Sequence, residues 1–183
     1  PVWARLAEAD VAVASHLADS GYNSFTVAWG GDAKFEGYAK GGVSVLGKVL
    51  VSDRAIHDTV ASMIIDGVFH RFPTLRFLSV ENGSDWIGLL VKRLKKQANQ
   101  TPWYFPEDAL DVVRRNVWVT PYYEEDIAAL ADLIGVERII FGSDWPHGEG
   151  LAEPVSFAKE LEGFDDAAVR RIMRDNAVEL LRL

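Results

Sequence analysis

Apolar residues along this chain alternate between short unbroken runs and stretches with helical spacing. After a first helical stretch at residues 2–9, short apolar runs lie at 11–15, 75–80, 117–120 and 139–141. Helical spacing follows these runs at 53–72, 87–97, 124–135 and 165–183. The pattern therefore predicts a strand, a loop and a helix, repeated four times.

Local signals set the limits of the predicted helices. Asp53 is placed to cap one helix that continues to Phe72, with apolar residues at every fourth position, and Pro73 ends it. Gly135 closes the helix at 124–135. The segment 29–47 is rich in glycine and shows no period, which predicts a long loop over the site.

Alternating strands and helices predict an α/β fold with a parallel sheet, in a single domain over residues 1–183. An open doubly wound sheet and a closed eight-stranded barrel both satisfy this pattern, and both place sites at the carboxyl ends of strands. No glycine-rich dinucleotide fingerprint follows any of the strands, which disfavours the doubly wound nucleotide binder.

The composition narrows the class of partner. The chain of 183 residues carries a net charge of -8, and its one basic cluster, at 91–97, fits the solvated face of a helix. Nucleic acid and anionic membranes are therefore not expected partners. No apolar run is long enough for a membrane span, and no export signal begins the sequence, so a cytoplasmic protein is expected.

The absence of cysteine excludes disulfides and thiolate metal sites, so His, Asp or Glu must hold any metal. His16, Glu81 and Asp144 follow three of the four predicted strands. In a closed parallel sheet the carboxyl ends of strands surround one mouth, so these side chains are expected to converge there. Together they are a ligand set for a divalent metal, although each alone also suits a structural role.

Further candidates surround these three residues. His147 lies three positions after Asp144 and is expected either to donate to the substrate or support the metal site, or to lie on the surface in neither role. His57, Trp86 and Trp145 are predicted to contact the substrate, while His70 is expected to be structural. Other aromatic residues in the loops could wall an apolar substrate or serve packing: Trp103, Tyr104, Tyr122 and Tyr123.

Three segments resemble the amidohydrolase-related family of metal-dependent TIM-barrel enzymes, which includes the aminocarboxymuconate-semialdehyde decarboxylase-like enzymes. They are RIIFGSDWPHGEG, HRFPTLRFLSVENGSDWIGLLVKRL and the closing RRIMRDNAVELL. The beginning of the chain, PVWARLAEADVAVASHLADSGY, resembles the region of the family's fifth strand. The resemblance implies the C-terminal half of a (β/α)8 barrel, with strands five to eight.

The family binds a divalent metal, often zinc, through a His-x-His pair on strand one, a His on strand five and an Asp on strand eight. The resemblance places the last two ligands at His16 and Asp144. Many members carry a His at the end of strand six, where this chain has Glu81, so the proton relay of the decarboxylases does not transfer directly. No His-x-His occurs in the sequence.

The chain, which begins with Pro1, is therefore expected to be a fragment of a longer enzyme. A half barrel exposes sheet edges and interior surface, so we expect it to pair with the missing N-terminal half or with another copy as a homo-oligomer. Alone it is expected to be inactive, with an incomplete metal site.

The leading hypothesis is a metal-dependent hydrolase or nonoxidative decarboxylase that acts on a small carboxylated or cyclic organic substrate. Asp144 would bind the metal and act as a base, and His16 would bind metal or orient substrate. Glu81 and His147 would transfer protons. The alternative is a noncatalytic barrel half that serves as a binding or assembly module.

Overall fold

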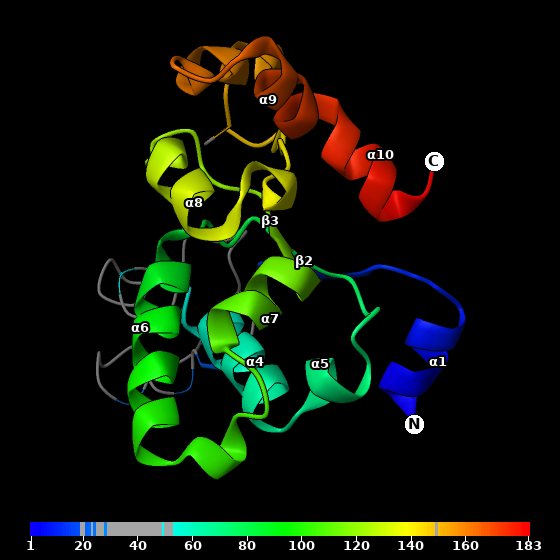
Figure 1. The fold of residues 1–183 in the computed structure, drawn as a ribbon. Helices are drawn as coiled ribbons and strands as arrows, with labels where there is room; N and C mark the ends of the chain where they lie inside the picture. Colours follow the sequence, from blue (N-terminus) through cyan, green and yellow to red (C-terminus); the bar gives the residue numbers. More distant parts are fainter. Residues whose placement is uncertain (19–20, 23, 25–27, 29–48, 50–52, 149) are drawn as a thin grey trace.

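The computed structural model describes residues 1–18, 21–22, 24, 28, 49, 53–148 and 150–183. The glycine-rich segment 29–47 lies outside them. Within this part, three parallel strands pair in the order β1 (Val13–His16), β2 (Phe77–Val80) and β3 (Val117–Val119) (Figure 1). The α/β class is thus confirmed, with helices and parallel strands in alternation.

The register aligns the ends of the first two strands. His16 is the partner of Val80, and Ser79 is the partner of both Ser15 and Val119. The residue after β2, Glu81, therefore begins the loop beside the end of β1. This register is the reason that two ionisable residues 65 positions apart can meet, as their numbers in the sequence show.

The fourth predicted strand is much shorter than expected. Ile139 forms one isolated parallel bridge with Val119, and the Ile140 amide donates to the Val119 carbonyl at 2.9 Å. The next amide, that of Phe141, donates instead to the Ile172 carbonyl at 3.0 Å. The chain leaves the sheet here because its backbone bonds to a helical segment rather than to β3.

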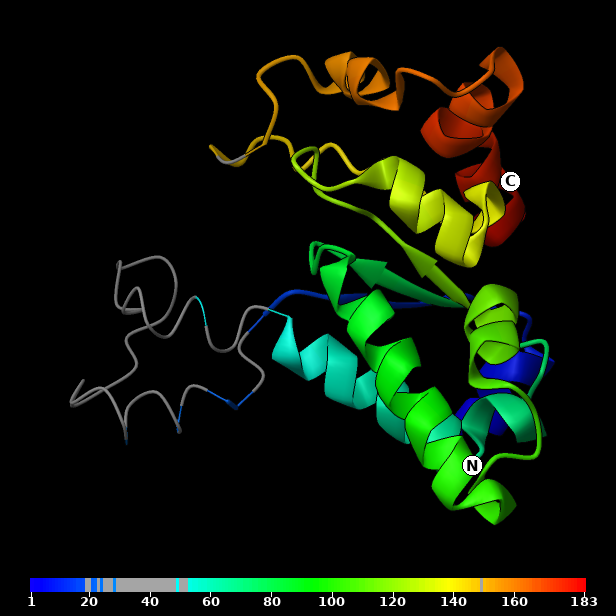
Figure 2. The ribbon, with the colours of Figure 1, turned by 60° about the vertical axis from the view of Figure 1, so that its left-hand side comes forward.

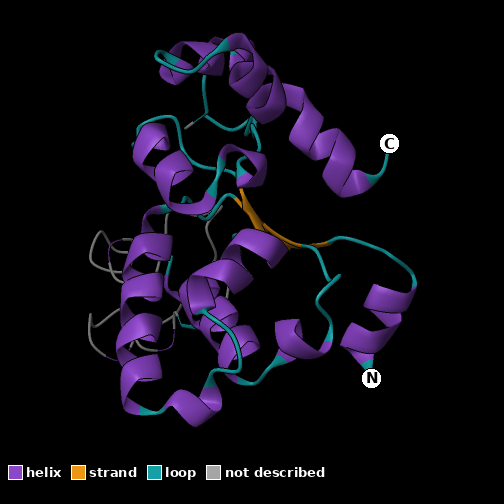
Figure 3. Ribbon diagram, in the orientation of Figure 1, coloured by secondary structure: helices purple, strands orange, loops and turns teal. Residues whose placement is uncertain are grey.

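The helices connect and cover these strands (Figure 3). The described α-helices are α1 (Val2–Glu8), α4 (Arg54–Ile65), α5 (Val68–Arg71), α6 (Asp85–Gln100), α7 (Ala109–Asn116), α8 (Ile127–Ile134), α9 (Asp166–Arg170) and α10 (Asn176–Leu181). The other helical segments are the 3-10 helices η2 (Pro102–Tyr104), η3 (Val136–Arg138) and η4 (Pro154–Leu161) and the π-helix η5 (Arg171–Asp175). None of the described helices is both long and apolar enough to cross a membrane.

The single helix predicted from Asp53 to Phe72 is wrong in two respects. It ends at Ile65 and resumes at Val68, because Gly67 adopts a left-handed conformation with φ of 69°. Asp53 precedes α4, but its side chain makes no capping hydrogen bond. The apolar spacing continues across the break, so periodicity alone does not reveal where the helix ends.

The main core lies between the sheet and the helices α4, α6, α7 and α8. Figure 2 shows α4 and α6 side by side on one face of the sheet. Val117 and Val119 enter this core, whereas Trp118 points to the other face and packs with Ile140 and Leu180. β3 is therefore buried on both faces, as expected of a parallel strand inside an α/β fold.

β1 differs from β3 because none of its residues is buried. It lies at the end of the strand order, and the only strand that pairs with it in the described part of the chain is β2. In the described sheet, β3 is buried by its surroundings, whereas β1 forms an edge with no buried residue.

Candidate functional site

The carboxyl ends of β1 and β2 bring together two of the predicted site residues. His16 ends β1, and Glu81 follows β2 directly. The Nε2 atom of His16 lies 2.9 Å from Oε2 of Glu81, and Nδ1 of His16 lies 2.7 Å from the Leu17 carbonyl oxygen. The convergence expected of these strand ends is present.

Asp144 and His147 approach the same carboxylate from the segment that follows Ile139. Nδ1 of His147 is 3.0 Å from Oδ1 of Asp144 and 3.9 Å from Oε1 of Glu81. One potential ligand atom from each of the three residues lies within 4.8 Å of the other two. We refer to His16, Glu81, Asp144 and His147 as the carboxyl-edge cluster.

Both carboxylates of the cluster stand on unusual backbone. Glu81 has a φ of 57° and Asp144 a φ of 50°. L residues other than Asn and Asp rarely adopt this left-handed region, so the strain lies at Glu81, and it persists only where surrounding contacts impose it. For Glu81 the contacts come from the loop after β3: its amide donates to Thr120 Oγ1 at 3.1 Å and its carbonyl accepts from the Tyr122 hydroxyl at 2.8 Å.

Asn82 ties the ends of the two strands together. Its buried side-chain amide donates to the Ser15 carbonyl at 3.1 Å and to the Val80 carbonyl at 2.7 Å. These bonds join the residue before His16 to the residue before Glu81. The spacing of the two strand ends that carry the imidazole and the carboxylate is therefore held by the Asn82 amide.

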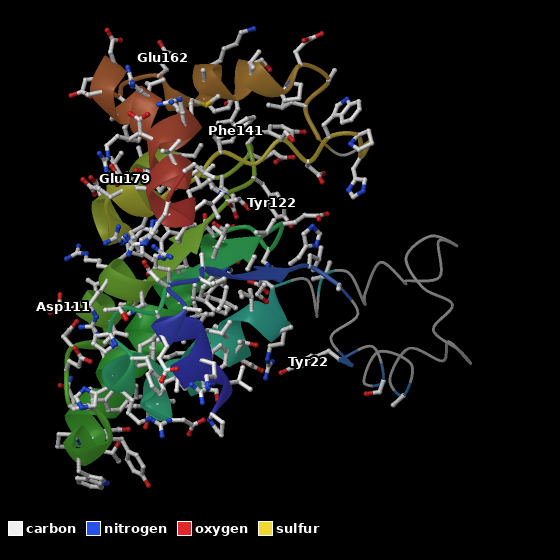
Figure 4. All side chains as sticks on the ribbon, turned by 90° about the vertical axis from the view of Figure 1, so that its right-hand side faces the viewer. Tyr22, Asp111, Tyr122, Phe141, Glu162 and Glu179 are labelled. Atoms are coloured by element: carbon white, nitrogen blue, oxygen red, sulfur yellow. The ribbon has the colours of Figure 1, made fainter. Side chains whose placement is uncertain are left out.

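A pocket of about 660 Å³ opens beside the cluster. Aromatic walls come from Tyr122, Tyr123, Phe141 and Phe157, and Figure 4 shows Tyr122 and Phe141 on the side opposite Asp111. Acidic residues also line it: Asp53, Glu81, Asp85, Glu124, Glu125, Asp126 and Asp144. No lysine or arginine of the described chain lines this pocket, so its own charge is negative.

Tyr122 is affected by this environment. Burial, together with the charges of Glu81 and Glu125, raises the pKa of its phenol from 10.0 to about 12. The phenol therefore keeps its proton at neutral pH and remains a donor to the Glu81 carbonyl.

The predicted substrate contacts do not assemble in the same way. Trp86 is a core residue, 1% exposed, whose indole N–H donates to the Gly83 carbonyl at 3.0 Å. At the start of the amphipathic helix α6, its indole packs in the core and does not contact the pocket. The His57 side chain is 12% exposed and its Nδ1 lies 2.8 Å from Oδ1 of Asp58, and neither His57 nor Trp86 lines the pocket.

Trp145 is exposed, and its backbone N–H donates to Ser143 Oγ at 3.3 Å. Of the other aromatic candidates, Tyr122 and Tyr123 line the pocket. Trp103 and Tyr104 lie beyond the far end of α6, in η2, and are not among its lining residues. His70, expected to be structural, pairs with Glu107 at 3.2 Å.

The donor set fits a divalent metal. Asp144, His147 and Glu81 offer oxygen and imidazole nitrogen atoms close enough to share one ion, and His16 lies against Glu81. This set differs from the predicted pair of His16 and Asp144, because His147 turns back toward Asp144. Sequence reasoning missed the supports Asn82, Thr120 and Tyr122, although each follows a strand end as Glu81 does.

Comparison with known proteins places this geometry in context. The family model described as Amidohydrolase matches residues 1–183. A 2-amino-3-carboxymuconate-6-semialdehyde decarboxylase of Dictyostelium discoideum is 24% identical over 129 residues, which cover 68% of this chain and 36% of the relative.

Two solved structures are similar in fold. An amidohydrolase from Mycobacterium avium subsp. paratuberculosis K-10 is 58% identical with a TM-score of 0.89, over 99% of this chain and 44% of that one. A dihydroxybenzoic acid decarboxylase from Polaromonas sp. JS666, with bound manganese and the inhibitor 2-nitroresorcinol, is 18% identical with a TM-score of 0.64. That match covers 100% of this chain and 53% of the other. The chain thus spans roughly a third to a half of the length of these three proteins.

Proposed function

The chain belongs to the amidohydrolase family, and on that premise we propose that it forms the C-terminal half, strands five to eight, of a metal-dependent (β/α)8 barrel enzyme. Two observations support this proposal. The chain covers 44% of the mycobacterial amidohydrolase, and β1 presents an open edge with no buried residue. A strand from the preceding half, or from another copy of the chain, would pair there.

The proposed reaction is the nonoxidative decarboxylation of a small carboxylated or cyclic organic substrate, with hydrolysis as the second possibility. Two relatives, from Dictyostelium and Polaromonas, carry the name of decarboxylases. The pocket volume of about 660 Å³ lies in the range of small-molecule sites. The acidic lining by itself would repel a substrate carboxylate. A bound metal ion would supply the positive charge that such a substrate requires.

The observation that carries the proposal is the carboxyl-edge cluster. Asp144, His147 and Glu81 would hold the divalent metal, with His16 beside them. A metal bound there would supply Lewis-acid chemistry, by attracting the negative charge of the substrate. Zinc remains the predicted ion, and the manganese of the Polaromonas relative makes Mn²⁺ the second ion to test.

The chain itself would supply a proton between His16 and Glu81. Nδ1 of His16 contacts the Leu17 carbonyl oxygen, which can only accept, so Nδ1 carries a hydrogen. The contact of 2.9 Å between Nε2 of His16 and Oε2 of Glu81 then requires a proton on one of the two atoms.

That proton meets the need of a decarboxylation. When CO2 leaves, the electron pair of the broken carbon–carbon bond stays on the substrate carbon, and a proton must replace the lost group. The His16–Glu81 pair would deliver it, while Asp144 and His147 would hold the metal. The localisation expected from the sequence, the cytoplasm, remains a prediction.

The test uses the complete protein that contains these residues. Asp144→Asn should lower the bound Zn²⁺ or Mn²⁺ and the turnover by more than about 100-fold, because a ligand matters at least as much as its supporting residues. The matched control is Asp166→Asn, which changes an exposed acid in the first turn of α9. Equal metal content and turnover in the Asp144→Asn variant and the unmodified protein would contradict the proposal, and metal-free protein without turnover would favour the noncatalytic binding module.

A further inference from the structure

We propose that Glu125 is a positioning residue for the carboxyl-edge cluster and acts through Glu81. This inference rests on the proposed metal-dependent function. Glu125 belongs to the loop between β3 and α8, whereas Glu81 belongs to the loop after β2. The two loops are joined by two separate links.

The first link is the Glu125 carboxylate itself. Oε1 accepts from the Ser84 amide at 2.8 Å and from the Asp85 amide at 3.3 Å. Oε2 accepts from the Ser84 hydroxyl at 2.8 Å and from the Tyr122 amide at 2.9 Å. One side chain thus bonds backbone on both loops.

This carboxylate replaces the local cap of α6. Ser84 occupies the N-cap position, yet its side chain makes no capping hydrogen bond to the helix. The first amides of a helix need an acceptor, and negative charge is favourable at that end. Because Glu125 supplies both, the start of α6 is held against the β3–α8 loop rather than by its own sequence.

The second link runs from the same loop to Glu81. The Tyr122 hydroxyl donates to the Glu81 carbonyl at 2.8 Å, and Thr120 Oγ1 accepts from the Glu81 amide at 3.1 Å. Residues 81–84 are therefore fixed at both ends by residues 120–125. Tyr122 is common to both links, since its amide donates to Glu125.

Close packing at Gly83 leaves little room for movement between the two loops. Gly83 has a φ of 60°, and a Cβ there would lie 2.6 Å from Oε1 of Glu125 and 2.9 Å from Cε2 of Tyr122. Only glycine leaves room for the carboxylate to reach Ser84 and Asp85. The left-handed conformation of Glu81 is thus imposed by a loop that Glu125 holds in place.

The expected consequence is an effect on metal affinity. If Glu125 orients Glu81, its loss should weaken Mn²⁺ binding by about 10-fold to 100-fold, the range for residues that support metal ligands. If it only caps α6, its loss should lower stability and leave the affinity unchanged. The two roles therefore differ in a measurable quantity.

The experiment compares Glu125→Ala with Asp108→Ala in the complete protein. Asp108 is a matched cap, because it accepts from the Leu110 and Asp111 amides of α7 and does not line the pocket. Mn²⁺ affinity is measured by titration with electron paramagnetic resonance, and stability by thermal unfolding. Both variants should unfold earlier, and only Glu125→Ala should bind Mn²⁺ about 10-fold more weakly.

Tyr122→Phe provides a second measurement that does not remove the cap. It breaks the hydroxyl contact with Glu81 and should weaken Mn²⁺ binding severalfold with the phenyl ring still in place. Unchanged Mn²⁺ affinity in both Glu125→Ala and Tyr122→Phe would overturn the inference. Asp144→Asn separates the two proposals: if it too binds Mn²⁺ normally, the proposed function fails, and if it alone loses Mn²⁺, only the role of Glu125 fails.

Discussion

Polar side chains at the two edges of the sheet have different kinds of partner. At the amino edge, Asn116 and Asn176 are 0% and 1% exposed and donate to backbone carbonyls. At the carboxyl edge, Glu81, Asp144 and His147 are only partly covered and contact one another. The first arrangement joins backbone segments to one another, and the second brings ionisable side chains together beside a pocket.

The two asparagines perform the same task in different units. Asn116 donates to the Pro73 and Leu75 carbonyls, at 3.0 and 2.7 Å, just before β2. Asn176 donates to the Val136 and Ile139 carbonyls, both at 2.8 Å, where the chain reaches β3. Each amide joins a helix to the segment that enters a strand, which buried backbone carbonyls require.

A polar residue near a strand is therefore not by itself a sign of a site. What distinguishes the carboxyl edge is a group of ionisable side chains that face one another beside a pocket. Left-handed backbone alone does not mark it, because the paired residues Asp10 and Arg182 also have positive φ. Substitutions at the two edges test this division, from the largest expected effect to the smallest.

The largest effect is expected at the amino edge, from Asn116→Ala. The substitution removes two buried hydrogen bonds and leaves two carbonyls without a donor, so the free energy of unfolding should fall by about 2–4 kcal/mol. Urea denaturation measures this change. Mn²⁺ affinity at temperatures where the protein is folded should stay as it was.

Asn99→Ala is the control for that experiment, since Asn99 is exposed on α6. It should change the unfolding free energy by less than about 0.5 kcal/mol. Asn116→Asp gives a further comparison, because a carboxylate cannot donate and should be at least as destabilising as alanine. A stable Asn116→Ala protein with altered Mn²⁺ binding would show that the two edges do not divide in this way.

At the carboxyl edge, His16→Ala should have the reverse effect. The imidazole is 59% exposed, so the unfolding free energy should change by less than about 0.5 kcal/mol. Without the imidazole, Glu81 loses its partner for the proton that the pair would deliver. Turnover should therefore fall by about 100-fold, the lower end of the range for general acid–base catalysis. Steady-state kinetics of the complete protein on a carboxylated substrate, with denaturation in parallel, separate turnover from stability.

His70→Ala is matched to it, because His70 is 55% exposed and also pairs with a glutamate, Glu107. It lies on α5, away from the pocket, and should leave turnover within about twofold, as expected of a surface change. Equal losses of turnover in the two variants would remove the special role of His16.

The smallest effect is expected at Asp58 on α4, whose carboxylate is bonded wholly within the chain. Partial burial opposes its ionisation, but hydrogen bonds from Arg54, Tyr22 and His57 outweigh burial and lower its pKa from 3.8 to about 2. Since the pKa is lower in the folded state, the stabilisation is present above about pH 4 and is lost as the pH falls through 2.

Asp58→Asn should therefore lose stability relative to the unmodified protein at neutral pH, and the difference should shrink below pH 4. The carboxylate is 34% exposed, so the difference should stay below about 1 kcal/mol. Thermal unfolding between pH 2 and pH 7 measures it, with the exposed Asp111→Asn as the control. A difference that grows as the pH falls would contradict the assigned hydrogen bonds.

Much of the fold was predictable from the sequence because burial imposes a visible period. The strand ending at His16 and the helix closed by Gly135 lie where the apolar pattern placed them. The break at Gly67 and the early end of the fourth strand were not predictable in the same way. The first depends on one left-handed residue inside a continuous apolar spacing, and the second on a bond from Phe141 to a helix 31 positions later in the sequence.

The sequence by itself placed His16, Glu81 and Asp144 at strand ends, since a parallel sheet gathers such residues at one edge. It could not show that Trp86 turns into the core, that His147 folds back onto Asp144, or that Glu125 reaches across to the start of α6. Period and composition record which residues are buried and which element they belong to. The partner of a half-buried charge is decided only when loops from separate strands come within hydrogen-bonding distance, and that distance is set by the tertiary structure.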